Sequence, residues 1–125
     1  MMSSKIQHHK IISLKNQKVI ADKALVANSF SRRFIGLMNR VELLEGEAMI
    51  FPRCSSVHTW FMKITIDIVF VKMTEDQCEV VKIFKSVKPW RLFPVSSVMA
   101  NSVIELPNHS IQKYDIKNGD ILCIA

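Results

Sequence analysis

The chain is poor in glycine and cysteine, and it lacks the short patterns that point to a common chemistry. Three of its 125 residues are glycine and three are cysteine. It contains no Ser-His-Asp set and no GxSxG, P-loop or GxGxxG pattern, which mark many hydrolases and nucleotide-binding proteins. No window reaches the roughly 18 uninterrupted apolar residues of a transmembrane helix. The sequence therefore describes a small globular domain without a recognisable reaction.

The cysteines and the start of the chain indicate a reducing compartment. Cys54, Cys78 and Cys123 are an odd number at wide spacing, with no CxxC pair and no zinc-ribbon spacing. The polar first residues carry no apolar segment of a secretory signal. Both features predict reduced thiols and a cytoplasmic location. We expect residues 1–9 to be a flexible tail and residues 10–125 to form a single globular domain.

The chain is basic, with a formal net charge of +6. Such a balance can indicate nucleic acid or an acidic membrane as the partner. The charges are dispersed, however, and there is no RNA-binding aromatic signature, helix-turn-helix pattern or arginine-rich tail. Nucleic acid is therefore not the expected partner. We expect a small molecule or a protein as partner, no cofactor, no membrane span, and a monomer or weak dimer.

Hydrophobic spacing predicts one main helix and many short strands. Apolar residues recur at helical spacing over about residues 29–40. Most of the remaining chain alternates or carries short apolar runs separated by turn residues. The predicted fold is of the α+β class and predominantly β, a small mixed β-barrel or sandwich with that single main helix.

Individual elements can also be placed. Residues 66–71 are apolar on both faces except for Asp67, which predicts a central, fully buried strand. Residues 58–64 alternate and predict another strand, whereas residues 92–97 are expected to form a loop. The other expected elements are two strands within residues 10–27, a strand at 48–51, a hairpin loop at 74–77, strands at 78–87 and 103–106, a helical turn at 110–114, a tight turn at 118–120 and a last strand at 121–124.

Six short motifs occur in an order and spacing that cover nearly the whole chain. They are Arg33-x-x-Gly36-Leu37-Met38-x-Arg40, His58-Thr59-x-x-Met62, Ile66-Asp67-Ile68-Val69-Phe70-Val71, Lys88-Pro89-Trp90-Arg91, Val103-Ile104-Glu105-Leu106-Pro107 and Gly119-Asp120. With them the chain resembles the family known as domain of unknown function 192. The resemblance implies a compact, β-rich α+β domain, and it implies no activity because the function of that family is not established.

Aromatic and basic residues gather in the stretch from residue 54 to residue 91. Tryptophan and arginine are typical anchors of binding surfaces, and an aromatic-walled pocket accepts a small ligand or a peptide. The leading hypothesis is a non-catalytic binding or accessory domain for a small anionic ligand or a peptide partner. The candidate ligand-binding residues are Arg40, His58, Trp60, Asp67, Lys88, Trp90 and Arg91.

Asp67 admits two interpretations. A buried carboxylate requires a partner, and the candidates are Arg91, Arg40, His58 or backbone amides at a strand end. In one interpretation the carboxylate fixes the register of a strand. In the other, Asp67 and His58 form the acid–base pair of a small enzyme, while Arg40 or Arg91 holds an anionic substrate.

A soft-metal site is the third hypothesis. Cys54, His58 and Met62 are spaced by four residues, and a thiolate, an imidazole and a thioether suit copper(I). Along an extended strand, however, four residues span about 13 Å, so a turn would have to bring Cys54 back toward the other two. Otherwise His58 is a hydrogen-bonded wall residue and Met62 fills the core.

Overall fold

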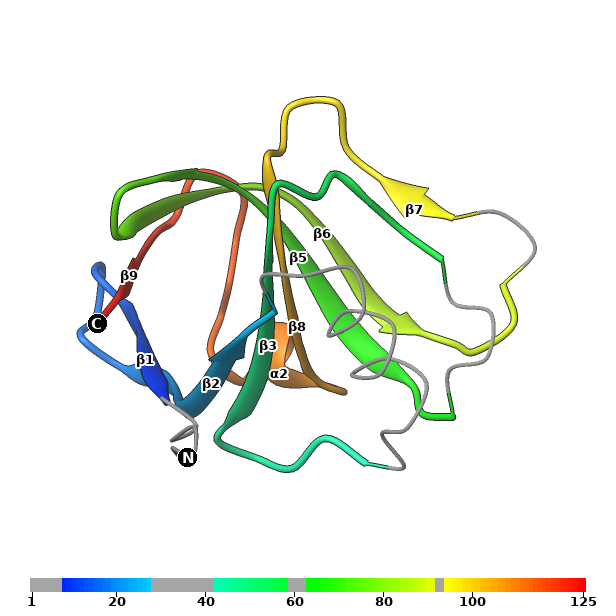
Figure 1. Cartoon of the computed structure of the whole chain (residues 1–125). Helices are drawn as coiled ribbons and strands as arrows, with labels where there is room; N and C mark the ends of the chain where they lie inside the picture. Colours follow the sequence, from blue (N-terminus) through cyan, green and yellow to red (C-terminus); the bar gives the residue numbers. More distant parts are fainter. Residues whose placement is uncertain (1–7, 28–41, 59–62, 92–93) are drawn as a thin grey trace, which may run out of the picture.

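Seven strands close into a barrel in the computed structural model, which describes residues 8–27, 42–58, 63–91 and 94–125 (Figure 1). In barrel order the strands are β1 (His9–Ser13), β2 (Val19–Val26), β3 (Glu47–Pro52), β8 (Ser102–Pro107), β5 (Ile66–Thr74), β6 (Gln77–Val87) and β9 (Ile121–Ile124). The predicted class, a predominantly β domain with a small barrel, is confirmed. The main helix expected at residues 29–40 lies outside the described residues.

Strand pairing closes the barrel between its first and last strands. All neighbours pair antiparallel except β2 and β3, which run parallel. Strand β1 pairs with β9, with Ile11 opposite Ile124, and Figure 1 shows the two lying together beside the C-terminus. Lys10 and Ala125 extend this pairing by exchanging two backbone hydrogen bonds of 2.9 Å. The ring of strands consequently has no free edge.

Two apolar clusters lie on opposite sides of the barrel wall. The first takes residues from all seven strands and therefore fills the interior, as the inward-facing positions of a small barrel must. The second takes alternate residues of β3, β5 and β8, including Met49, Ile68 and Val103, and lies on the outer face. Because β5 contributes to both clusters, residues 66–71 are all buried, as predicted for a central strand.

A small second sheet covers part of the outer cluster. It pairs β4 (Ser56–Val57) with β7 (Val95–Ser96), and it buries Val57 and Val95 against the wall. The structure differs from two of the sequence-based predictions in this region. The region expected to be a loop at residues 92–97 contains β7, and the strand expected at 58–64 is absent at its described residues, His58, Lys63 and Ile64.

The two ends of the barrel differ. At one end a short helix, α2 (Ser110–Lys113), follows β8 and places Ile111 in the interior cluster, with Ile116 just beyond it. This is the helical turn expected at residues 110–114. At the other end the β5–β6 hairpin turns at Glu75 and Asp76, as predicted for residues 74–77. Within the described ranges, no helix combines the length and apolar character needed to cross a membrane.

Candidate functional site

A β-bulge in β6 shapes the candidate site. Ile66 pairs with Val87, but two residues later Ile68 pairs with Phe84, so β6 contains one residue more than β5 over this stretch. Ser86 lies in the bulge with a φ of 51°, in the left-handed region that non-glycine residues seldom adopt. Bulges bend a strand and redirect its side chains, and they are frequent beside binding sites.

Asp67 holds this bulge in place. Its side chain is fully buried, and its two oxygens accept hydrogen bonds of 2.8 Å from the backbone amides of Ser86 and Ile111. The Ser86 hydroxyl donates a further bond of 2.7 Å to the side-chain oxygen of Asn108. Of the partners left open by the sequence, the structure gives Asp67 backbone amides, and the carboxylate ties β5 to β6 and to α2.

A basic pocket lies on the outer side of the bulge; we call it the bulge pocket. It has a volume of about 330 Å³ and is lined by Phe84, Lys85, Ser86, Val87, Lys88 and Arg91. Among the described residues, the lining therefore includes three cationic side chains and no carboxylate. Lys85, Lys88 and Arg91 are all exposed, so their charges can meet a ligand from solvent. This is an electrostatic setting that favours an anion.

Phe84 forms the aromatic wall of the bulge pocket. It packs edge-on against the buried Phe70, with ring centroids 5.7 Å apart, which fixes its position. Cations approach the same ring: the Lys82 ammonium lies 5.0 Å from its centroid and the Arg91 guanidinium lies 6.0 Å from it. These are cation–π distances, so the ring helps to hold the positive charges beside the pocket.

Trp90 lies between the lining residues Lys88 and Arg91 in the sequence, and it combines an exposed side chain with an unfavourable backbone conformation. Its side chain is 62% exposed, and its backbone has a φ of 60° in the turn that follows β6. A left-handed conformation is unfavourable for a bulky residue, and exposure of an indole forgoes the stabilisation of burial. Conformational outliers of this kind are concentrated at functional sites.

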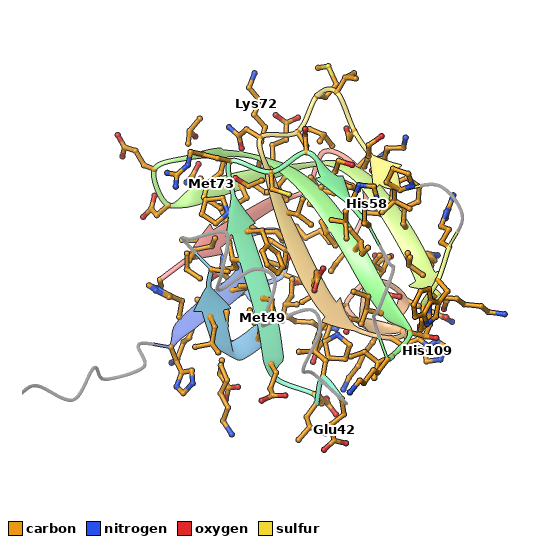
Figure 2. The ribbon with its side chains drawn as sticks, turned by 45° about the vertical axis from the view of Figure 1, so that its right-hand side comes forward. Glu42, Met49, His58, Lys72, Met73 and His109 are labelled. Atoms are coloured by element: carbon orange, nitrogen blue, oxygen red, sulfur yellow. The ribbon has the colours of Figure 1, made fainter. Side chains whose placement is uncertain are left out.

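The structure separates the other candidate residues. Asp67 and Lys88 belong to the bulge region, whereas His58 is exposed just beyond β4, and Figure 2 shows it on the side of the molecule that carries β7. No hydrogen bond joins Asp67 to His58, both of which are described. Arg40, Trp60 and Met62 lie outside the described residues.

The proposed metal ligands can be followed only in part. Cys54 is half-buried, and its thiol donates to the Ser56 carbonyl oxygen at 3.2 Å. Across the described ranges, no group of three or more histidine, cysteine or acidic residues is arranged to hold a metal ion. Since Met62 is not described, the Cys54, His58 and Met62 set as a whole stays a prediction.

Burial makes one cysteine chemically inert. The Cys78 thiol faces the barrel interior, and burial raises its pKa to about 12, with smaller contributions from Cys123 and Asp76. It therefore carries no appreciable thiolate at neutral pH, and the thiolate is the reactive form.

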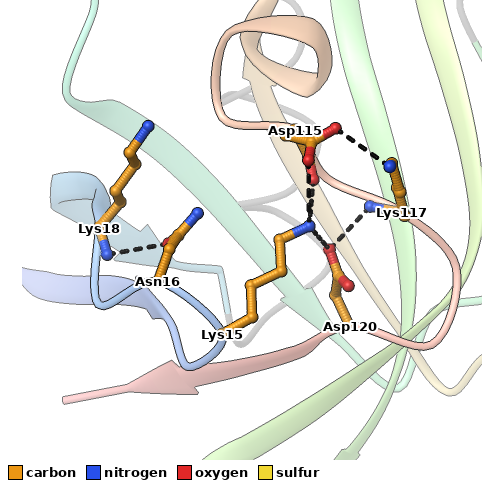
Figure 3. A network of polar contacts seen from close by, with 6 residues as sticks. All are labelled: Lys15, Asn16, Lys18, Asp115, Lys117 and Asp120. Atoms are coloured by element: carbon orange, nitrogen blue, oxygen red, sulfur yellow. Dashed lines mark hydrogen bonds and ion pairs between the residues drawn. The ribbon is translucent and has the colours of Figure 1, made fainter.

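A second charged cluster balances its own charges (Figure 3). Lys15 contacts Asp120 at 2.7 Å and also Asp115, and Asp115 lies 3.6 Å from Lys117. The hydrogen bond to Asp120 raises the pKa of Lys15. Burial alone would raise the pKa of Asp120, but hydrogen bonds from Lys15 and from the Lys117 amide outweigh it and lower that pKa. In contrast to the bulge pocket, this cluster has two carboxylates for its two lysines.

Sequence reasoning identified two of the three lining cations, Lys88 and Arg91, but it missed Lys85, the aromatic wall and the bulge that supports the pocket. Lys88, Trp90 and Arg91 stood out as a motif. Phe84 did not, because a phenylalanine in an apolar strand has no feature that sets it apart. The Ser86 bulge was also missed, since a one-residue register shift depends on the partner strand. The isolated acid in an apolar run was the only signal, and it correctly indicated that a partner lies close by.

Comparison with known sequences gives a consistent family. Residues 11–124 match the DUF192 family, described as an uncharacterized ACR. A UPF0127 protein of Pyrococcus furiosus is 28% identical over 118 residues, which cover 90% of this chain and 95% of the relative. A UPF0127 protein of Thermococcus sibiricus is 30% identical over 114 residues, which cover 88% and 71%.

Solved structures show the same fold. A protein of unknown function from Novosphingobium aromaticivorans has a TM-score of 0.74 at 24% identity, covering 91% of this chain and 81% of that one. A Sinorhizobium meliloti protein, named as a candidate transcription regulator, has a TM-score of 0.76 at 18% identity, covering 93% and 91%. At these identities the likeness establishes the barrel architecture.

Proposed function

This chain belongs to the DUF192 family, and from the geometry of the β6 bulge we propose that it is a non-catalytic binding module for an acidic segment of a partner protein. The supporting observation is the bulge pocket itself. Lys85, Lys88 and Arg91 line it, no carboxylate is among its described lining residues, and Lys82 approaches the same aromatic wall. Because several positive charges gather at one pocket, an anionic partner gains favourable electrostatic interactions there.

The shape of the region favours a peptide over a small anion. The bulge pocket is open, its cationic side chains are exposed, and Trp90 presents an apolar surface directly beside Lys88 and Arg91 in the sequence. An acidic side chain can pair with the cations while a neighbouring apolar side chain packs on the indole. Tryptophan and arginine side by side are the usual anchors of protein interfaces.

Binding of a labelled peptide tests the proposal. The probe is a fluorescent peptide of alternating glutamate and leucine, and the readout is anisotropy at low salt. We expect Lys85→Glu and Lys88→Glu each to weaken binding about tenfold, because each replaces attraction by repulsion at short range. The matched control is Lys18→Glu, an exposed lysine that does not line the pocket.

Three results would contradict the proposal. Equal losses in Lys18→Glu and in the pocket variants would mean that only the net charge of the protein matters. Full competition by millimolar inorganic phosphate would identify a small-anion site instead. Unchanged affinity in both pocket variants would place peptide binding elsewhere. We expect the affinity for the peptide to fall steadily as salt is added, because the exposed charges of the pocket are screened by ions.

A further inference from the structure

Among the described residues, the end of the barrel opposite α2 forms a second pocket, distinct from the bulge pocket, and we call it the mouth pocket. At this end β1, β6 and β8 begin, and β2, β3, β5 and β9 end. Helix α2 closes only the opposite end. The mouth pocket has a volume of about 270 Å³. This is slightly below the ~300 Å³ at which pockets for drug-sized ligands begin, so its ligand must be small.

The walls of the mouth pocket are apolar. Val26, Ile50, Met73 and Ile124 line it, and all four belong to the interior cluster or pack against it. Ile50 is almost fully buried, while the other three are half-buried. An alkyl group placed here would leave water for a surface that is already part of the core.

The rim of the mouth pocket is acidic. Glu75 and Asp76 line it together with His9, and no lysine or arginine is among its described lining residues, although the chain as a whole carries a net charge of +6. The hairpin tip that bears Glu75 and Asp76 is fixed, because Thr74 pairs with Gln77 and the Ile124 amide donates a 2.8 Å hydrogen bond to the Asp76 carbonyl oxygen. The backbone that carries the two acidic residues is therefore held beside the apolar walls.

We propose that the mouth pocket binds a small primary amine that carries a short alkyl chain. The ammonium group pairs with Glu75 and Asp76 at the rim, and the alkyl chain enters between Val26, Ile50 and Met73. The assignment rests on the charge of the rim and on the apolar walls. An alkyl carboxylate would be repelled by the acidic residues at the rim. A cation without an alkyl chain would bury no apolar surface against the walls.

Methyl-detected NMR of the whole chain tests this assignment. The probes are hexylammonium, hexanol and hexanoate, which carry alkyl chains of nearly equal length and differ in charge, titrated at pH 8 and low salt. We expect hexylammonium to shift the methyl signals of Ile50 and Ile124 and to bind at least tenfold more tightly than hexanoate. Exchanging both rim carboxylates, in Glu75→Gln/Asp76→Asn, should remove most of that preference. The matched control is Glu79→Gln, an exposed acid of the same hairpin that does not line the pocket.

A variant that fills the mouth pocket with a larger apolar side chain tests the site independently of charge. Val26→Phe should occupy the mouth pocket and abolish the shifts at Ile50, and its thermal unfolding is recorded to show that it is folded. Equal binding of hexanol and hexylammonium would overturn the charge assignment. Absence of shifts at Ile50 and Ile124 with every probe, or shifts that persist in folded Val26→Phe, would overturn the site. None of these results bears on peptide binding at the bulge pocket, so the two proposals fail separately.

Discussion

Trp90 combines an unfavourable backbone conformation with an exposed indole. At a φ of 60° it occupies a region that favours glycine and asparagine. If this state serves binding, replacing the residue should improve the fold and impair the function. We expect Trp90→Asn to leave the free energy of unfolding unchanged or to raise it by about 1 kcal/mol, since asparagine tolerates this conformation.

The same Trp90→Asn protein should bind the acidic peptide at least tenfold more weakly. Urea denaturation measures the first effect and anisotropy the second. A loss of stability together with unchanged binding would mean that the indole supports the turn and has no role at the pocket.

Asp67 acts through buried hydrogen bonds, and its removal should affect stability strongly. In Asp67→Ala the amides of Ser86 and Ile111 lose their acceptor, and the Ile111 bond is buried. We expect a loss of about 3 kcal/mol in the free energy of unfolding, because unsatisfied buried donors are costly. Glu79→Gln, an exposed acid on the neighbouring strand, should change it by less than about 0.5 kcal/mol. Comparable urea midpoints for wild type and Asp67→Ala would show that the bulge is held by other contacts.

At the scale of the element, the turn between α2 and β9 is stabilised by a carboxylate. Asp120 accepts from the Lys117 amide at 2.8 Å and from Lys15 at 2.7 Å, and its pKa is lowered as a result. A lowered pKa in the folded state gives stability that is present above the unfolded pKa of about 3.9 and is lost as pH falls through the folded value.

Asp120→Asn should therefore reduce the stability of the protein at neutral pH and leave it unchanged in acid. We expect it to lower the free energy of unfolding by about 1 kcal/mol at pH 7, where the ionised hydrogen bond and ion pair are present. The difference should shrink toward zero near pH 2. Thermal unfolding of both proteins across this range gives the comparison. A difference that is constant with pH would assign the effect to turn geometry alone.

Elements defined by their own residues were predictable, and those defined by a neighbour were not. The turn containing Asn118 and Gly119 follows from local chemistry, and Gly119 indeed has a φ of 92°. The doubly buried β5 was visible as a continuous apolar run. In contrast, β7 has two residues and exists only because β4 lies opposite it. The Ser86 bulge likewise depends on the register between β6 and β5. The bulge that supports the candidate site therefore could not be predicted from the sequence, whereas the charged motif at Lys88 and Arg91 could.

At the scale of the whole molecule, the barrel interior is one continuous core, and a change in its closing strand should affect the entire fold. Leu122 in β9 is 1% exposed and belongs to the interior cluster. We expect Leu122→Ala to lower the free energy of unfolding by about 3 kcal/mol, from lost burial and the cavity left behind.

Because the chain is proposed to be a single domain, Leu122→Ala should still unfold in one cooperative transition. Circular dichroism and tryptophan fluorescence should give the same midpoint. Two separated transitions would mean that part of the barrel remains folded without an intact closing strand.

The β1–β9 seam also has a consequence for the order in which the structure forms. Hairpins such as β5–β6 join strands that are neighbours in the chain, and they can assemble early. The seam joins Ile11 to Ile124, at opposite ends of the sequence, and closing so long a loop carries a large entropic penalty before any contact repays it. Until the seam closes, β1 and β9 each expose a row of unpaired backbone groups that can pair with another chain. We therefore expect closure of this seam to be the slow step of folding, and the interval before it to be when the protein is most prone to aggregate.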